Sequence, residues 1–350
     1  MNLYKEIENR LGKEQRLIQA THLRAPQGSI ESMERQLWSL NDAPEELKET
    51  AKEVLLEGMP KVIKNEDNDI FLEPFYKEER LVVFGGGHIA LPVVEFGAKI
   101  GFSVTVVDDR LAFANEKRFP HATHVICDSF ENAIEQLNIT ETDYLVIITR
   151  GHTHDATCLR KLLTYDETIY LGMIGSMRRV TALKKLLVEE GYDAQRLERV
   201  CTPIGLRIGA ITPEEIAISI LAQIIERKRL GGHQGAAGGE KYINRSDLDY
   251  RVINYLSSHP KEMRSIVTVI SALGSVPRGP GAKMVVFSNG RIIGSIGGGC
   301  SEGAVIQNAM DIIGTGKYEV QTIDMTGDVA EDEGMVCGGV MKVLIEDDLF

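Results

Sequence analysis

A glycine-rich turn in the middle of the chain has the residue types and spacing that bind a dinucleotide. The segment FGGGHIALPVVEFGAKIGFSVTVVDD contains Gly85-x-Gly87-x-x-Ala90, and His88 lies within the turn. Gly85 permits a tight turn, Gly87 lets a pyrophosphate approach the backbone, and Ala90 lets the following helix pack closely on its strand. The free amides and the positive dipole end of that helix favour phosphate. The spacing therefore predicts a nucleotide site.

Acidic residues follow this turn at the distance that ribose recognition requires. Asp108 and Asp109 lie at the end of the next expected strand, roughly 20 residues further on. A carboxylate there accepts hydrogen bonds from ribose hydroxyls and favours NAD over NADP. We expect Asp108 to make this contact, although a shift of one residue would exchange it with Asp109. A Rossmann fold without a cofactor, or with another ligand, stays open as the alternative.

A third polar segment, RGHTHD, follows the strand expected at residues 144–149. It lies at the carboxyl edge of the sheet, where ligands bind in such folds. Arg150 and His152 are candidates for ligand contact there. A metal held by His152, His154 and Asp155 is the alternative, but adjacent side chains point in different directions and Asp155 also suits a helix cap.

A second glycine turn follows the strand expected at residues 169–173. Gly175 and Ser176 lie at its junction with a helix, and Arg178 and Arg179 come directly after. Backbone amides and cations at a helix start can hold an anion. A plain turn followed by a solvated basic helix face is the alternative interpretation.

Three glycine-rich stretches in the last hundred residues could carry further chemistry, at residues 274–283, 294–303 and 334–339. Glycines beside a cysteine let a large ligand approach the backbone, and a thiolate binds soft metals. A cysteine also serves as a small buried hydrophobic residue, which is the alternative. The candidate contacts are Arg278, Lys283, Gly297, Gly298, Gly299, Cys300, Cys337 and Gly338, with Cys337 and Cys300 nearest to a metal.

The elements that must position the first motifs alternate between strands and helices. Apolar runs predict strands at residues 81–84, 103–107, 124–127, 144–149 and 169–173, with helices starting near Ile89, Phe130, Asp155 and Met177. Strands that are apolar on both faces, with helices between them, predict a doubly wound parallel sheet of the α/β class. A last helix is expected from Pro213, with Thr212 as its cap.

Composition changes sharply after this region, and the whole chain divides into four predicted segments. These are a reduced N-terminal domain at 1–78, a Rossmann dinucleotide-binding domain at 79–229, a glycine-rich linker at 230–248 and a smaller α/β or α+β domain with the glycine–cysteine stretches at 249–350. Residues 3–17 and 69–73 resemble residues 250–265 and 341–346. The first segment is therefore predicted to be a partial copy of the last, although a shared helix–strand plan without duplication stays open.

Composition excludes several classes of protein. A net charge of −12 argues against nucleic acid or an anionic membrane as the main partner. No apolar run reaches the length that spans a bilayer, and the charged N-terminus is unlike a signal peptide. Five cysteines without a C-x-x-C pair predict neither a disulfide framework nor an all-cysteine zinc site. We expect a cytoplasmic protein, and the long linker and paired ends suggest a homodimer.

At the glycine–cysteine stretches the sequence resembles the XdhC/CoxI family, which comprises accessory factors of xanthine dehydrogenase and related molybdenum hydroxylases. The resemblance covers residues 80–229 and 250–348, and it is carried by GSIGGGCSEGA, EDEGMVCGG and PIGLRIGAITPEEIAISI. It implies a maturation factor, or chaperone, that binds molybdenum cofactor in its molybdopterin form, supports its sulfuration and delivers it to the hydroxylase. A cysteine desulfurase is a further implied partner.

The resemblance also implies roles for single residues. Cys300 matches the family's GGGC cysteine and Cys337 its CGG cysteine, whereas Gly85, Gly87 and Asp108 match its nucleotide turn and acid. The order of domains departs from the family's usual one, because here the intact glycine–cysteine domain follows the Rossmann domain. Two other functions stay open. One is an NAD(P)-dependent oxidoreductase in which His152 or His154 handles protons, and the other is an idle scaffold whose Rossmann site only regulates assembly.

Overall fold

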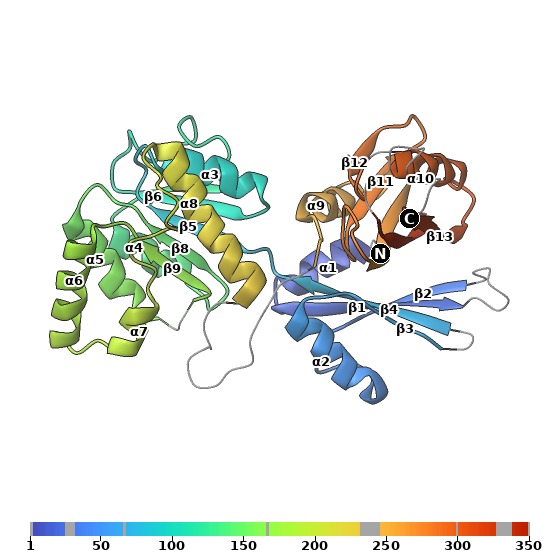
Figure 1. Cartoon of the computed structure of the whole chain (residues 1–350), viewed down its shortest axis with the longest axis horizontal. Coiled ribbons are helices and arrows are strands. Elements are labelled where there is room, and N and C mark those ends of the chain that lie inside the picture. Colours follow the sequence, from blue (N-terminus) through green and yellow to red (C-terminus); the bar gives the residue numbers. More distant parts are fainter. Residues whose placement is uncertain are drawn as a thin grey trace. The chain divides into compact units, whose positions relative to one another are not determined.

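The computed structural model describes residues 3–24, 32–65, 68–165, 168–231, 246–298, 300–326 and 338–348. These residues form two compact units, which Figure 1 colours along the chain. One unit, Glu78–Ile243, is continuous in sequence. The other combines both ends of the chain, Met1–Lys77 and Asn244–Phe350. None of the described helices is long and apolar enough to cross a membrane.

The continuous unit is built on a parallel sheet of five strands in the order β7-β6-β5-β8-β9. The strands are β5 (Arg80–Phe84), β6 (Ser103–Asp108), β7 (His124–Cys127), β8 (Tyr144–Ile147) and β9 (Tyr170–Met173). The strand order reverses between β5 and β8, and that switch point is where doubly wound sheets bind ligands. The predicted Rossmann fold and its five strands are confirmed.

Helices cover both faces of this sheet, as the two-sided apolar strands require. The helices are α3 (Ala90–Lys99), α4 (Phe130–Leu137), α5 (His152–Leu162), α6 (Met177–Glu189), α7 (Ala194–Arg199) and α8 (Pro213–Glu226), followed by the short π-helix η3 (Arg227–Gly231). One buried core packs α3 and α8 against one face of the sheet. A second core packs the helices α4, α5, α6 and α7 against the other face. Helix α8 starts as predicted, with Pro213 in the first turn and a capping box between Thr212 and Glu215.

The unit formed by the two chain ends contains two antiparallel sheets. The N-terminal copy, residues 3–76, consists of α1 (Leu3–Leu11), β1 (Arg16–Arg24), β2 (Ser32–Trp38), η2 (Glu45–Leu47), α2 (Lys48–Glu57), β3 (Lys61–Ile63) and β4 (Asn68–Tyr76). The C-terminal copy, residues 250–347, consists of α9 (Tyr250–Ser258), β10 (Arg264–Leu273), β11 (Lys283–Phe287), β12 (Ile292–Gly294), α10 (Cys300–Asp311), β13 (Tyr318–Asp324) and β14 (Val340–Asp347).

The two copies share one topology. The N-terminal sheet has the order β2-β1-β4-β3, and the C-terminal sheet has β12-β11-β10-β14-β13. When the additional edge strand β12 is left aside, β2, β1, β4 and β3 correspond in order to β11, β10, β14 and β13. The registers agree as well, because Thr21 of β1 pairs with Arg35 and Phe71, as Thr268 of β10 pairs with Lys283 and Leu344. The N-terminal segment is therefore a reduced structural relative of the C-terminal one.

Both copies contribute to common hydrophobic cores. One core combines apolar residues of α1, β1 and β4 with those of α9, β10 and β11. A smaller core contains Leu23 and Phe71 beside Ile270 and Leu344, of which Phe71 and Leu344 hold equivalent positions in the two registers. The sequence predicted a separate domain at each end of the chain, whereas in the structure both ends belong to one compact unit. Most of the predicted linker, residues 232–245, lies outside the described residues.

Candidate functional site

The predicted nucleotide turn (the Gly85 turn, residues 85–90) lies where the Rossmann fold requires it. Strand β5 ends at Phe84 and α3 begins at Ala90, so the turn is at the carboxyl edge of the sheet. Gly85 has a φ of +116°, and a Cβ there would lie 2.4 Å from the Ile148 carbonyl oxygen. A Cβ on Gly87 would meet no atom within 4 Å. The first glycine is thus required by packing, and Gly87 leaves open space for a ligand.

Asp108 anchors the Gly85 turn to the neighbouring strand. Its buried carboxylate accepts a hydrogen bond from the Gly86 amide at 2.8 Å, and three from the amide and guanidinium of Arg110 at 2.8–3.1 Å. A carboxylate accepts about four hydrogen bonds. A ribose would therefore have to replace donors from Arg110, and recognition of ribose by Asp108 stays a prediction.

Asp109 and Arg150, both predicted site residues, are brought together across the sheet edge. The Arg150 guanidinium forms a two-pronged ion pair with the Asp109 carboxylate, with Nη2 and Oδ2 2.8 Å apart. The hydrogen bond from Arg150 lowers the pKa of Asp109 to about 2. This pair connects the loops that follow β6 and β8, on either side of β5 in the strand order.

The Gly85 turn also contacts an arginine that the sequence did not indicate. Arg118 donates from Nε to the Gly86 carbonyl oxygen at 3.0 Å, and its guanidinium lies 5.1 Å from the Phe113 ring centroid. Its Nη2 is buried and has no hydrogen-bond partner among the described residues. A single arginine in a long loop carries no sequence signal, so only its place beside the turn identifies it as a candidate ligand contact.

The histidines of this edge do not form a metal site with their described neighbours. His88 and His152 are exposed, and the His154 ring lies edge-on to Phe130 with centroids 5.6 Å apart. Gly151 is the N-cap of α5, whereas Asp155 is buried and accepts hydrogen bonds from the Thr149 amide and hydroxyl. Burial raises the pKa of Asp155. Within the described residues no group of three or more His, Cys, Asp or Glu side chains could hold a metal.

The second glycine turn lies at the start of α6. Ser176 is the N-cap of this helix and makes no side-chain capping hydrogen bond. Ser176 is exposed and Gly175 half-buried, and a Cβ on Gly175 would lie 3.0 Å from Val180 Cγ2. The turn is therefore open to solvent, and its predicted role as an anion cradle stays a prediction.

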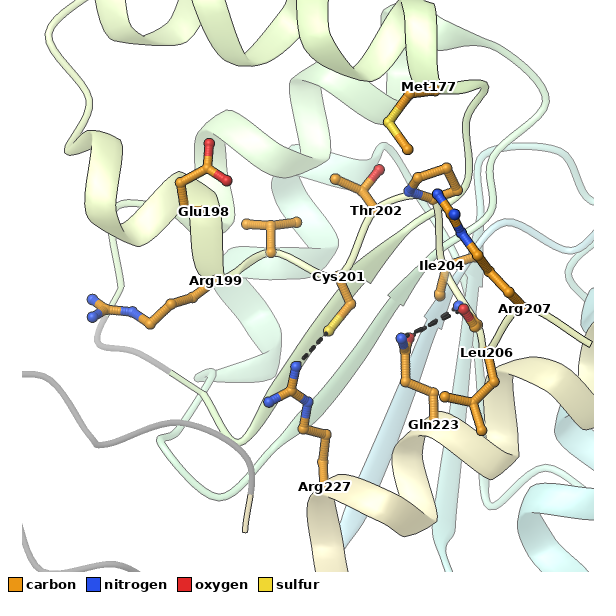
Figure 2. Close-up of a pocket in the computed structure, with 13 residues that line it drawn as sticks. Met177, Glu198, Arg199, Cys201, Thr202, Ile204, Leu206, Arg207, Gln223 and Arg227 are labelled. Atoms are coloured by element: carbon orange, nitrogen blue, oxygen red, sulfur yellow. Dashed lines mark hydrogen bonds between the residues drawn. The ribbon is translucent and has the colours of Figure 1, made fainter. Parts of the chain in front are cut away.

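A pocket of about 530 Å³ lies beyond β9, next to this turn (Figure 2). Cys201 extends the parallel sheet by one bridge to Gly172, and the pocket forms around the segment that follows. Its walls come from the start of α6, the end of α7, this segment and α8. The lining residues are Met177, Glu198, Arg199, Val200, Cys201, Thr202, Pro203, Ile204, Gly205, Leu206, Arg207, Gln223 and Arg227.

Two contacts shape this pocket. Arg227 reaches from the end of α8 toward Cys201, with Nη2 3.7 Å from Sγ, as Figure 2 shows. The Gln223 side chain accepts a hydrogen bond from the Gly205 amide at 2.9 Å. Residues 203–220 carry part of the family resemblance in the sequence, but no ligand contact was predicted there. The sequence signal that could have indicated the pocket is the spacing of Pro203, Gly205 and Arg207 in the segment after Cys201.

In the C-terminal copy, the glycine-rich stretches converge at one place. A Cβ on Gly297 would lie 2.2 Å from Pro277 Cγ, and one on Gly339 would lie 2.5 Å from the Ser275 carbonyl oxygen. A Cβ on Gly274 would lie 3.1 Å from the Gly338 carbonyl oxygen. The first stretch therefore packs against the described parts of both others, which brings all three to one region.

Two glycines of this cluster face open space. A Cβ on Gly338 would meet no atom within 4 Å, and one on Gly298 would meet only the Glu302 carboxylate at 3.9 Å. Cys300 is the first residue of α10. The predicted Gly299 and Cys337 lie outside the described residues. Side chains therefore do not crowd Gly298 and Gly338.

The two predicted cations of this region are engaged elsewhere. Lys283 is 2% exposed, and its Nζ donates to the Glu73 carboxylate at 2.9 Å and to Thr268 Oγ1 at 3.0 Å. Arg278 forms a two-pronged ion pair with Asp247, at 2.7 and 3.0 Å. Because its ammonium is buried in an ion pair, Lys283 cannot reach a ligand in the glycine cluster, and we leave it out of the candidate site.

Comparisons with known proteins agree with this architecture. Residues 81–224 match the XdhC Rossmann domain, and residues 262–324 match the XdhC and CoxI family. The uncharacterized protein YqeB of Escherichia coli (strain K12) is 33% identical over 160 residues, which cover 45% of this chain and 29% of YqeB. A probable xanthine dehydrogenase component of Bacillus subtilis (strain 168) is 32% identical over 167 residues, 47% of this chain and 48% of that protein.

This chain thus matches less than half the length of either curated relative. Among solved structures, a xanthine dehydrogenase from Bacillus halodurans aligns with a TM-score of 0.41 and 22% identity, over 65% of this chain and 94% of that one. That likeness is too weak to carry a functional conclusion. The two family matches coincide with the parallel-sheet unit and with the C-terminal copy, and the chain belongs to the XdhC and CoxI family.

Proposed function

We propose that this protein is an accessory factor of a xanthine-dehydrogenase-type hydroxylase, and that it carries molybdenum cofactor as its cargo. The observation that supports this most directly is the convergence of the three glycine stretches in the segment that matches the XdhC and CoxI family. Gly298 and Gly338 lie near the first turn of α10, and neither position is crowded, since a Cβ on Gly298 would meet only Glu302 at 3.9 Å and one on Gly338 would meet no atom within 4 Å. Amides at a helix start favour a phosphate group, which the molybdopterin form of the cofactor carries.

In this proposal the thiols of Cys300 and Cys337 approach the metal, because thiolates are the protein ligands that suit a soft, sulfur-rich centre. Bound cofactor would supply the molybdenum and its sulfur ligands. The chain's own contribution is to hold the cofactor through backbone amides, to support its sulfuration, and to release it to the hydroxylase. A cysteine desulfurase would be the partner that provides sulfur.

The test is the molybdenum content of protein purified after co-expression with cofactor biosynthesis. We expect Cys337→Ala to lose most bound molybdenum and Cys300→Ala to lose less, since Gly338 and Gly339 after Cys337 allow closer approach. Cys127→Ala is the matched control, because Cys127 is an exposed cysteine at the end of β7 in the other unit. Wild-type molybdenum content in both first variants would contradict the proposal.

The proposal includes a nucleotide at the Gly85 turn, either NAD(P) or the nucleotide part of a dinucleotide form of the cofactor. A ligand at roughly 100 times its Kd stabilises the folded state by about 2.7 kcal/mol. We expect NAD(H) or an adenylate to raise the Tm of the wild type but not of Gly87→Val. Since a Cβ on Gly87 meets no atom within 4 Å, the variant should fold normally and lose only the ligand effect.

Molybdenum content and an assay of nucleotide turnover distinguish this proposal from the rival function. An NAD(P)-dependent oxidoreductase would bind nucleotide at the Gly85 turn, oxidise or reduce it with a substrate, and carry no molybdenum. Turnover that is lost in both His152→Ala and His154→Ala would favour that rival.

The predicted homodimer is part of the proposal as well, and a monomer mass by light scattering at micromolar concentration would remove it.

A further inference from the structure

The pocket around Cys201 is a second site, distinct from the Gly85 turn. None of its 13 lining residues belongs to that turn or to the loop that follows β6. In the strand order it lies beyond β9, whereas the turn follows β5, on the other side of β8. Its volume of about 530 Å³ falls within the range of roughly 300–1,000 Å³ that small-molecule sites occupy.

The lining of this pocket is positively charged. It contains Arg199, Arg207 and Arg227 but only one acidic residue, Glu198. Glu198 is itself paired with Lys184, with Nζ and Oε2 3.6 Å apart. In Figure 2 the Arg199 and Arg207 side chains lie on opposite sides of Cys201. Such a concentration of guanidinium groups is unexpected in a chain of net charge −12, and it favours an anionic ligand.

The pocket also offers neutral polar and apolar contacts. The hydroxyl of Thr202 is buried and has no hydrogen-bond partner among the described residues. A buried hydroxyl without a partner costs free energy, and a ligand that supplies the partner recovers it. Met177, Ile204 and Leu206 provide apolar surface beside these groups. The pocket therefore fits a molecule with an apolar body and a charged end.

We propose that this pocket binds a small organic oxyanion, namely a phosphate ester of about nucleotide size, through Arg207 and Arg227. Guanidinium groups hold phosphate oxygens by two parallel charge-assisted hydrogen bonds. The Thr202 hydroxyl provides a further donor, and the apolar wall holds the body of the ester. This site does not depend on the proposed cargo or on the nucleotide at the Gly85 turn.

Cys201 makes occupancy of the pocket measurable. Burial raises the pKa of its thiol, and the nearby Arg227 opposes that increase. The thiol is half-buried, so it should react slowly with iodoacetamide, and a ligand in the pocket should block the reaction. Two other cysteines of the same unit calibrate the measurement, because Cys127 is exposed and Cys158 is fully buried.

The experiment follows alkylation of each cysteine by peptide mass spectrometry in the full chain, with three probes. AMP carries a phosphate on a nucleoside with a flat aromatic base, adenosine carries only that nucleoside, and inorganic phosphate carries only the charge. We expect AMP to slow alkylation of Cys201 about tenfold or more at saturation, phosphate to act only at much higher concentration, and adenosine to have no effect. Equal protection by adenosine, or none by AMP at millimolar concentration, overturns the proposal.

Variants locate the ligand. Arg207→Gln should weaken AMP protection of Cys201 by about tenfold or more, the contribution of a charge-assisted hydrogen bond. Lys185→Gln is the charge-matched control, since this exposed lysine of α6 does not line the pocket. Gly87→Val should keep full protection, which separates this site from the Gly85 turn. The proposal is contradicted if AMP still protects Cys201 fully in Arg207→Gln. In that variant an unreactive Cys158 serves as evidence that the unit is folded. Loss of protection in Gly87→Val also contradicts the proposal.

Discussion

The N-terminal and C-terminal copies share their topology and register but differ in the loop that precedes the second helix. In the N-terminal copy, side chains stabilise this loop, since Asp42 accepts hydrogen bonds from Ser39 Oγ at 2.6 Å and from Arg10 at 3.2 Å. In the C-terminal copy, β12 is added and glycines lead into α10, where Gly297 packs on Pro277. Side chains hold the C-terminal loop as well, because Glu302 accepts hydrogen bonds from Ser295 Oγ at 2.9 Å and from the Ile296 amide at 3.0 Å. The loops therefore differ in their glycine content rather than in the presence of polar contacts.

The copies hold each other through two reciprocal ion pairs. Arg35 of β2 pairs with Glu346 of β14, and Lys283 of β11 pairs with Glu73 of β4. Arg35 and Lys283 hold equivalent register positions, and so do Glu73 and Glu346. The carboxylates are both buried, at 0% exposed for Glu73 and 2% for Glu346, but the cations differ, because the Lys283 side chain is 3% exposed and that of Arg35 is 23% exposed. This difference predicts unequal energies for two geometrically equivalent contacts.

The largest effect should come from the fully buried pair. Lys283→Ala leaves Glu73 buried and unpaired, which costs about 3–5 kcal/mol. Arg35→Ala should cost less, because water can reach the space that the partly exposed Arg35 leaves. Urea unfolding checks both variants, followed by fluorescence of Trp38, the chain's single tryptophan, which is buried in this unit.

Equal decreases in the free energy of unfolding of these two variants would show that burial does not distinguish the two ion pairs. A double variant, Lys283→Met with Glu73→Leu, should recover most of the stability, because an apolar pair of similar volume removes both buried charges. No recovery would mean that Lys283 stabilises the unit by contacts other than Glu73.

A smaller effect should separate two glycines of the C-terminal cluster. Gly297→Ala forces a Cβ to within 2.2 Å of Pro277 Cγ at a φ of +140°, and overpacking of this kind costs about 1–3 kcal/mol. Gly298→Ala meets open space, so only its φ of +74° opposes the change, at about 1 kcal/mol. The midpoint of urea unfolding measures both. A larger loss in Gly298→Ala would contradict the packing of the loop on Pro277.

The smallest effect should come from the polar loop of the N-terminal copy. Burial acts to raise the pKa of Asp42, but hydrogen bonds from Ser39 and Arg10 outweigh it, so the pKa lies below the ordinary value of an aspartate. A lowered carboxyl pKa stabilises the fold above the unfolded-state pKa, and this stabilisation is lost as the pH falls through the folded-state pKa. Asp42→Ala should therefore cost less than about 1 kcal/mol at pH 6. As the pH falls through the folded-state pKa, the wild type and the variant should converge, and a constant difference would exclude the carboxylate as the cause.

Local patterns were sufficient to predict the parallel-sheet unit. The five strands, the Gly85 turn and the capped start of α8 follow from apolar periodicity, glycine spacing and the Thr212-Pro213 signal. These features depend on neighbours within a few residues, which the sequence displays directly. The sequence also indicated the three glycine stretches as candidate ligand contacts, but their packing against one another appears only in the structure.

Long-range packing set the environment of the individual side chains, and here the sequence predictions failed or were silent. Lys283 looks like a free loop cation in the sequence, yet Glu73, 210 residues away, takes its ammonium into a buried ion pair. The Cys201 pocket needs α6, α7 and α8 to meet around one loop, and Arg118 matters only because its loop lies beside Gly86. Charge and residue type are properties of the sequence. Burial and partners arise when the faces of distant elements meet, since the cost of desolvating each group depends on what packs over it.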